Sequence, residues 1–278
     1  MNAVAEVEGL RFDLSPRSAH SIAIPMDFEG PQPSFFGAPP ARRKPLSSGS
    51  FTGDTREGGS CNCEVLEIIP HCNGTHTECV GHITRERATV PEQIGAVLAP
   101  ALLVSLSPEP FGRNEEQGPD KATAEDPVIT REALRTAFDR CQPEIPPQAL
   151  VLRTLPNSPE RADRDWMSGP PSAWFTLEAV DWLAGAGIRH LLTDQPSIDR
   201  PDDDGQLLAH HRFWGLPQGS DRLGEASRAE ASVTEMILVP DDLKDGLYLL
   251  DLQLPPLRTD AVPSNPLLYP LIGPRQPG

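Results

Sequence analysis

The chain has 278 residues, of which 38% are hydrophobic and 23% charged, and this balance excludes a chain that is disordered throughout. Its formal net charge of −16 disfavours binding to nucleic-acid phosphates, and its sequence contains no apolar run long enough to span a membrane. The 32 prolines exclude an all-helical bundle and favour strands joined by ordered loops.

The cysteines and the N-terminus predict a cytoplasmic protein. Residues 1–10 are acidic and lack the basic and apolar pattern of a secretory signal. Five cysteines are an odd number in a long chain without a signal for export, so we expect them to be reduced thiols.

The first predicted elements follow a region, residues 1–60, that is rich in proline, glycine and serine. We expect residues 31–50 to form a loop that serves as a lid or a subunit contact. Residues 63–69 are largely apolar and β-branched, which predicts a strand, and the apolar residues 101–106 predict a buried strand. The polar, acidic segment 107–127 predicts a surface loop.

Two helices that begin at threonine caps are predicted over residues 130–141 and 176–185. Residues 149–155 and 188–192 predict strands, and the second of these follows the glycine turn that ends the second helix. A helix, a glycine turn and a strand in this order indicate α/β packing.

Two further strands are predicted over residues 233–239 and 246–254, with residues 240–245 as the turn that joins them. Glu235 lies within the first of these apolar segments. A glutamate is costly to bury unless it is paired or coordinates a metal, so Glu235 is a candidate functional residue.

Residues 71–82 hold three of the seven histidines together with two cysteines and one glutamate. In an extended chain, residues two apart point to the same face, which would place Cys72, His76 and Glu78 together. Imidazole, thiolate and carboxylate groups are the usual ligands of zinc and similar divalent ions. The alternative interpretation is a surface strand without a ligand, and the spacing is not that of a zinc finger.

This cluster resembles the signature HxGTHxDxxxH of the cyclase family, which includes bacterial kynurenine formamidases and isatin hydrolase. Residues 74–78 followed by His82 carry the resemblance. It implies that His76 is a metal ligand and that His82 is the general acid/base. Glu78 stands where the family has aspartate, and Cys72 stands where it has the first histidine.

The identity of the first ligand stays open, because His71 lies one residue before Cys72. Strand parity favours Cys72. Residue type favours His71, which would need a bulge to turn inward.

The resemblance extends beyond the signature. Residues 12–15 resemble the opening DLS strand of the family, and residues 209–215 resemble its HxxLLG element. By position His210 is the implied metal ligand of that element, with His211 as the alternative. Glu235 matches the glutamate that completes a two-metal site in the formamidases.

The resemblance implies hydrolysis of a C–N bond in an amide, formamide or cyclic amide, as in kynurenine formamidase. It implies a divalent cation, Zn²⁺ with Mn²⁺ as the alternative, that lowers the pKa of a bound water and polarises the carbonyl. His82 would then move the proton. The candidate metal ligands are Cys72, His71, His76, Glu78, His210 and Glu235.

Two other classes of function stay open. A dehydratase or ring-closing cyclase could use the same histidine without net hydrolysis. The second class is a non-catalytic protein that binds a small molecule and has lost its metal. The departures from the family signature at Cys72 and Glu78 motivate this alternative. No GxSxG motif supports a serine hydrolase.

We therefore expect an α/β protein with a cyclase-like fold, in which helices flank a central mixed or barrel-like sheet. A single domain is expected over residues 1–278, with the proline-rich region at about 1–60. The expected partners are a small amide substrate and further copies of the chain in a homodimer, without nucleic acid or membrane. Four aromatic residues could line a pocket for an aryl substrate, namely Phe35, Phe36, Trp174 and Trp214.

Overall fold

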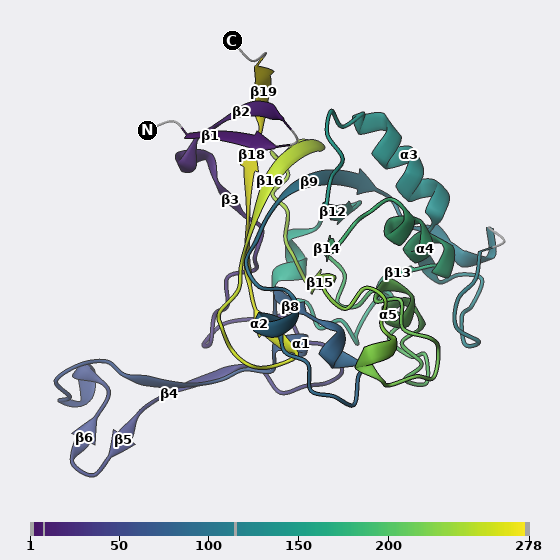
Figure 1. Ribbon diagram of the computed structural model, residues 1–278. Coiled ribbons are helices and arrows are strands. Elements are labelled where there is room, and N and C mark those ends of the chain that lie inside the picture. Colours follow the sequence, from purple (N-terminus) through teal and green to yellow (C-terminus); the bar gives the residue numbers. More distant parts are fainter. Residues whose placement is uncertain (1–2, 8, 114–115, 276–278) are drawn as a thin grey trace.

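The computed structural model describes residues 3–7, 9–113 and 116–275, and its central feature within these residues is a curled mixed sheet (Figure 1). This sheet has nine strands in the described part of the chain. In spatial order they are β17 (Ala261–Pro263), β8 (His76–Glu78), β15 (Ser232–Glu235), β14 (His190–Thr193), β12 (Ala149–Thr154), β9 (Val97–Leu106), β16 (Gly246–Gln253), β18 (Asn265–Pro270) and β3 (His20–Ser21).

The middle of the sheet is parallel and its flanks are antiparallel. Strands β9, β12, β14 and β15 run parallel to one another, whereas β8 and β17 are added antiparallel on one side and β16, β18 and β3 on the other. All six residues of β12 are buried, as expected for a parallel strand that is covered on both faces. The predicted α/β fold with a mixed, barrel-like sheet is confirmed.

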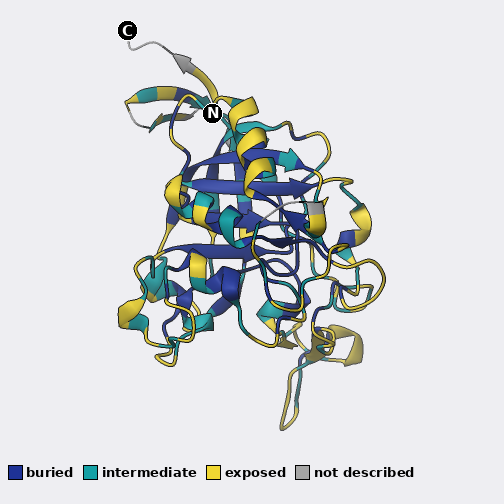
Figure 2. Cartoon of the chain, turned by 90° about the vertical axis from the view of Figure 1, so that its right-hand side faces the viewer, coloured by how far each residue is buried: buried dark blue, intermediate teal, exposed yellow. Residues whose placement is uncertain are grey.

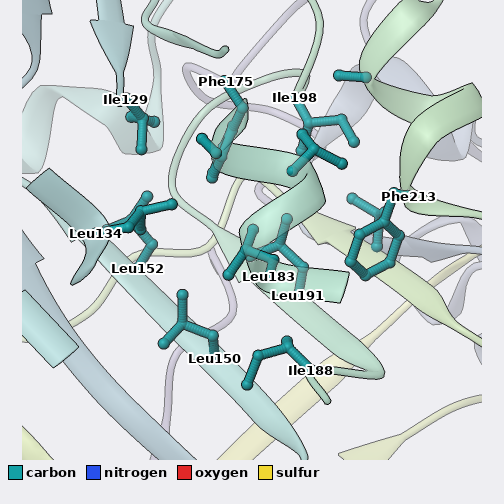
Figure 3. Close-up of a cluster of buried hydrophobic side chains, with 14 of the residues drawn as sticks. Ile129, Leu134, Leu150, Leu152, Phe175, Leu183, Ile188, Leu191, Ile198 and Phe213 are labelled. Atoms are coloured by element: carbon teal, nitrogen blue, oxygen red, sulfur yellow. The ribbon is translucent and has the colours of Figure 1, made fainter. Parts of the chain in front are cut away.

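Alternating side chains divide the interior into two apolar layers. Leu150 and Leu152 on β12 pack in the layer beneath the helices, whereas Ala149 and Val151 pack on the opposite face of the sheet. Figure 3 shows the first layer, in which Leu150 and Leu152 lie with Leu183. Figure 2 shows that the central strands are buried while the helices expose one face.

The three larger helices cover one face of the sheet (Figure 1). They are α3 (Arg131–Cys141), α4 (Leu177–Gly185) and α5 (Leu208–Phe213), and α1 (Pro70–Asn73) and α2 (Val90–Gln93) are single turns. Both predicted caps are confirmed: the Thr130 hydroxyl accepts a hydrogen bond from the Ala133 amide, and the Thr176 hydroxyl accepts one from Ala179. The predicted strands at 101–106, 149–155, 188–192 and 246–254 are also found, with small shifts at their ends.

The proline-rich N-terminal region contains more strand than we expected. Within the predicted loop 31–50, β4 (Arg42–Pro45) pairs with β7 (Glu64–Glu67), and β5 (Ser47–Ser48) pairs with β6 (Phe51–Thr52). Figure 1 shows that this arm projects away from the rest of the molecule. The loop prediction is wrong there, because backbone pairing with a distant segment leaves no periodic signal in a polar, proline-containing stretch.

The remaining elements are short strands outside the central sheet and single 3₁₀ turns. They are β1 (Ala3–Val7), β2 (Leu10–Leu14) and β19 (Ile272–Arg275) in one sheet, β10 (Glu109–Pro110), β11 (Pro127–Ile129) and β13 (Trp174–Phe175) in another, and the 3₁₀ turns η1 (Pro16–Ser18), η2 (Thr55–Glu57), η3 (Val80–His82), η4 (Phe111–Arg113), η5 (Pro159–Ala162) and η6 (Leu223–Glu225). The predicted surface loop 107–127 therefore contains β10 and η4, and its residues 114–115 lie outside the described residues.

Among the described helices, none is both long and apolar enough to cross a bilayer. All five cysteines are free thiols.

Candidate metal centre

The centre begins with two residues on neighbouring strands. His76 on β8 lies directly opposite Glu235 on β15 in the antiparallel register, which turns both side chains to the same face. His76 Nε2 is 3.4 Å from Glu235 Oε2. His76 Nδ1 lies 2.9 Å from the Gly74 carbonyl and donates to it, which fixes the ring and directs Nε2 toward Glu235. This Nε2 is buried and has no hydrogen-bond partner among the described residues.

Glu78 is the second buried carboxylate of the centre and lies two residues further along β8, on the same face as His76. Its Oε1 is 2.7 Å from His210 Nε2. Its Oε2 faces the other side, 3.1 Å from His71 Nδ1 and 3.9 Å from His82 Nε2. Glu78 therefore joins the deeply buried part of the centre to its more open part.

His210 is held in place by a carboxylate from another loop. His210 Nδ1 lies 2.6 Å from Oδ2 of Asp199, and Asp199 also accepts hydrogen bonds from the backbone amides of Ala209 and His210 at the start of α5. A carboxylate on one ring nitrogen fixes the ring orientation and directs the other nitrogen toward a metal, as is usual for metal-binding histidines. His210 Nε2 faces Glu78 and Glu235.

The open side of the centre is formed by His71, His82 and Asp260. The two imidazole rings stack with their centroids 4.2 Å apart, and their side chains are 26% and 27% exposed. Asp260 Oδ2 lies 2.8 Å from His71 Nε2 and 3.6 Å from His82 Nδ1. These exposures make the stacked pair the part of the centre that a small molecule can reach.

The histidines and carboxylates of the centre shift the pKa values of one another, because they lie in direct contact. Burial alone would lower the pKa of His71, but contacts with Asp260 and Glu78 raise it to about 10. Burial also opposes the charged form of His210, yet Glu78 and Asp199 hold the pKa of His210 well above its ordinary value. Against the effect of burial, His82 and His210 hold the pKa of Glu78 well below its usual range. Without a metal, positive charge in this centre is supplied by protons.

The donor atoms fit a divalent cation. Ligand atoms of His76, Glu78 and Glu235 lie within 4.8 Å of one another, and so do those of His71, Glu78 and His82. The first group is fully buried and places two carboxylates beside an imidazole nitrogen without a partner. Buried like charges are costly unless a positive charge lies between them, and nitrogen and oxygen donors suit Zn²⁺ or Mn²⁺.

Cys72 does not share a face with His76 and Glu78 as strand parity predicted. Pro70 begins the single helical turn α1, so residues 70–73 are not extended and the parity argument is wrong. Gly74 then turns the chain with a φ of 154°, a conformation that favours glycine, before β8 begins. The turn places His71 against Glu78 and leaves Cys72 packed in an apolar cluster with Phe35.

The other predicted candidates lie in different surroundings, and Trp214 is the one that contacts a histidine of the centre in the described structure. Trp214 lies beside the His210 ring, with centroids 5.3 Å apart, and Trp174 packs against Phe111 instead. Phe36 is 61% exposed. His211, the alternative to His210, faces the Pro217 carbonyl rather than the centre.

Sequence reasoning missed Asp260, which completes the open side. The residue precedes the three-residue strand β17, which pairs with β8 and so brings Asp260 beside the histidines. A single aspartate in a proline-rich segment carries no periodic or motif signal.

Solved structures share this fold at low sequence identity. An isatin hydrolase bound to the product analogue thioisatinate aligns with 92% of this chain and 94% of its own at 14% identity, with a TM-score of 0.62. Isatin hydrolase A from Labrenzia aggregata aligns with 90% and 93% of the two chains at 18% identity and a TM-score of 0.60. A predicted metal-dependent hydrolase from Bacillus stearothermophilus aligns with 90% and 97% at 17% identity and a TM-score of 0.56.

No curated protein matches the chain. The family model described as "Putative cyclase" matches residues 13–200, which include the signature block, His76 and His82. That match spans more than half of the sequence and confirms the resemblance carried by residues 74–82. The chain belongs to the cyclase family.

Proposed function

We propose that the protein is a metal-dependent hydrolase that cleaves the C–N bond of an amide, formamide or cyclic amide. The observation that carries the proposal is the buried Nε2 of His76, which has no hydrogen-bond partner in the described structure and faces the carboxylates of Glu78 and Glu235. The names of the structural neighbours, isatin hydrolase and metal-dependent hydrolase, support the same reaction class.

We assign the metal to Zn²⁺, with Mn²⁺ as the alternative. Its proposed ligands come from five residues that the fold brings together, namely His71, His76, Glu78, His210 and Glu235. A bound divalent cation would supply Lewis acidity, which lowers the pKa of water and polarises the scissile carbonyl. Among the two candidates for the first ligand we propose His71, because its Nδ1 faces Glu78 while Cys72 packs among apolar side chains.

His82 is the proposed proton carrier. With Nδ1 protonated and facing Asp260, its Nε2 is free to take a proton from the attacking water on the side of Glu78. The water oxygen bonds to the carbonyl carbon, the C–N bond breaks, and His82 delivers the proton to the departing nitrogen. Asp260 is the proposed positioning residue, since a carboxylate on Nδ1 selects the useful tautomer.

The proposed substrate has an aryl group, as in a kynurenine formamidase-like reaction. Trp214 stands beside His210, and Phe35 lies with Cys72 and Trp166 in the apolar cluster behind α1. These aromatic side chains are buried, so they do not line an open pocket, and the aryl preference is supported instead by the isatin hydrolases among the structural neighbours. We place the enzyme in the cytoplasm, in line with its five free thiols.

We further propose a homodimer, in which the projecting arm of β4 to β7 packs on a second copy. The arm exposes Leu46 (38%) and Leu66 (53%), and isolated two-stranded hairpins are marginally stable in water. Light scattering at micromolar concentration should give the mass of a dimer. A monomeric mass there would rule the dimer out.

The function is tested by element-specific metal analysis of protein purified without chelator, followed by turnover of N-formylkynurenine and isatin. We expect stoichiometric Zn²⁺ or Mn²⁺, cleavage of one of these amides, and loss of activity after chelation. Protein that binds no metal and turns over neither compound would favour a non-catalytic binding protein instead.

A further inference from the structure

A polar cavity of about 460 Å³ lies next to the open side of the metal centre. Arg85, Arg87 and Arg258 line it, and Asp260 forms part of its wall. Because Asp260 also contacts His71 and His82, a molecule bound in the cavity would lie beside the proposed proton carrier. Its volume is within the range of small-molecule binding sites.

Two of these arginines are free to bind a ligand. Arg85 forms a hydrogen-bonded ion pair with Asp221, at 2.8 and 3.1 Å. Arg87 and Arg258 are exposed, and in the described part of the chain neither forms an ion pair or donates a side-chain hydrogen bond. Guanidinium groups are planar forks of donors that match carboxylates, so two unpaired ones on one cavity favour an anionic occupant.

The position of these arginines beside the centre matters because the protein as a whole is strongly negative. The chain carries a formal net charge of −16, and the centre itself holds Glu78, Glu235, Asp199 and Asp260. An anionic substrate would be repelled by this field unless local positive charge opposed it. The arginine-lined cavity supplies that charge directly beside the centre.

We propose that this cavity binds the anionic group of the substrate, and that the enzyme acts on amides that carry a carboxylate. The inference rests on the proposed hydrolase function for the reaction, whereas the anion site itself depends only on the cavity. Arg87 and Arg258 are the specificity-determining residues in this proposal, and neither is required for the hydrolytic step.

Binding can be measured without turnover. We expect calorimetry on the purified protein to show benzoate binding about tenfold or more tightly than its neutral match benzamide, the usual scale of a charge-assisted hydrogen bond. The double variant Arg87→Ala/Arg258→Ala should lose this preference, while lysine replacements should retain part of it. The matched control is Arg42→Ala, which removes an exposed arginine of the arm outside the cavity.

Equal binding of the two compounds by the wild type, or an unchanged preference in the double variant, would overturn the anion site. If a bound metal holds benzoate, the binding should persist in the double variant. The comparison therefore distinguishes binding by the arginines from binding by the metal.

Kinetics with N-formylanthranilate and formanilide, which differ by one carboxylate, connects the site to the reaction. We expect kcat/KM for the carboxylated compound to fall at least tenfold in the double variant, with formanilide unchanged. Cleavage of both compounds without a charge preference would overturn the inference and leave hydrolysis standing. Charge-selective binding without any cleavage would support the anion site and count against the proposed function.

Discussion

His76 Nε2 lies 3.4 Å from Glu235 Oε2, because the two residues stand opposite each other on antiparallel strands β8 and β15. This pairing joins the signature block to a glutamate far away in the sequence, and Glu78 adds a second carboxylate to the same face. The candidate metal-binding face is thus a product of strand register, and a slip of one residue would turn His76 and Glu78 away from Glu235.

Asp199 should control metal affinity through His210. Asp199→Asn keeps the shape of the side chain but removes the charge that orients the ring, so we expect metal affinity to fall by roughly 10- to 100-fold. Competition with a chromophoric chelator measures this. Asp203→Asn is the matched control, because Asp203 caps the same loop through the amides of Gly205 and Leu207. An equal loss in both variants would point to a general defect of the loop.

His71 and Cys72 should respond differently to substitution. His71→Ala should weaken metal binding, whereas Cys72→Ala should keep the metal and lose roughly 1 kcal/mol of stability, the scale of one buried methyl-sized group. Metal content and thermal unfolding of the two purified variants decide this. Loss of metal in Cys72→Ala with retention in His71→Ala would make the thiolate the ligand.

The stability of the metal-free protein should depend on pH through His71. Against the effect of burial, Asp260 and Glu78 raise the pKa of His71 from 6.5 to about 10. The charged ring therefore contributes its full stabilisation of the folded state below pH 6.5, and this stabilisation is lost as the pH rises through 10. Between pH 7 and pH 10, the Tm of the chelated wild type should therefore fall further than the Tm of the chelated Asp260→Asn variant. Parallel curves for the two proteins would show that Asp260 does not hold the proton on His71.

Metal affinity should rise over the same pH interval. A cation on Nδ1 of His71 must displace the proton that lies there, facing Glu78, when the ring is charged in the metal-free protein. Titration with Zn²⁺ in a weakly buffered solution should release protons at pH 7 and fewer as the pH approaches 10. Binding without proton release at pH 7 would exclude His71 as a ligand.

Elements with local signals could be predicted from the sequence. Thr130 and Thr176 cap helices α3 and α4 because a hydroxyl followed by an apolar face of helical spacing is sufficient on its own. His76 and Glu78 share a face because both lie within one short strand. A glutamate within an apolar strand needs a partner, so the sequence alone marks their neighbour Glu235 as a candidate.

Features that depend on long-range pairing could not be predicted. Asp260 reaches the histidines only because β17 pairs with β8, and the arm forms because β4 pairs with the distant β7. The helical turn at α1 reversed the parity argument for Cys72, since Pro70 favours the first turn of a helix over a strand. In each case the deciding contact lies outside the window that a local pattern covers.

The roles of His76 and His82 can be separated by measuring metal content and turnover in the same two variants. His76→Ala should lose the metal, because it removes a ligand from the fully buried group. His82→Ala should keep metal near the wild-type level and lose turnover by roughly a hundredfold or more, the scale of a positioned proton transfer. Metal loss in His82→Ala would make His82 a ligand, and a His76→Ala variant that retains both metal and activity would contradict the hydrolase centre described above.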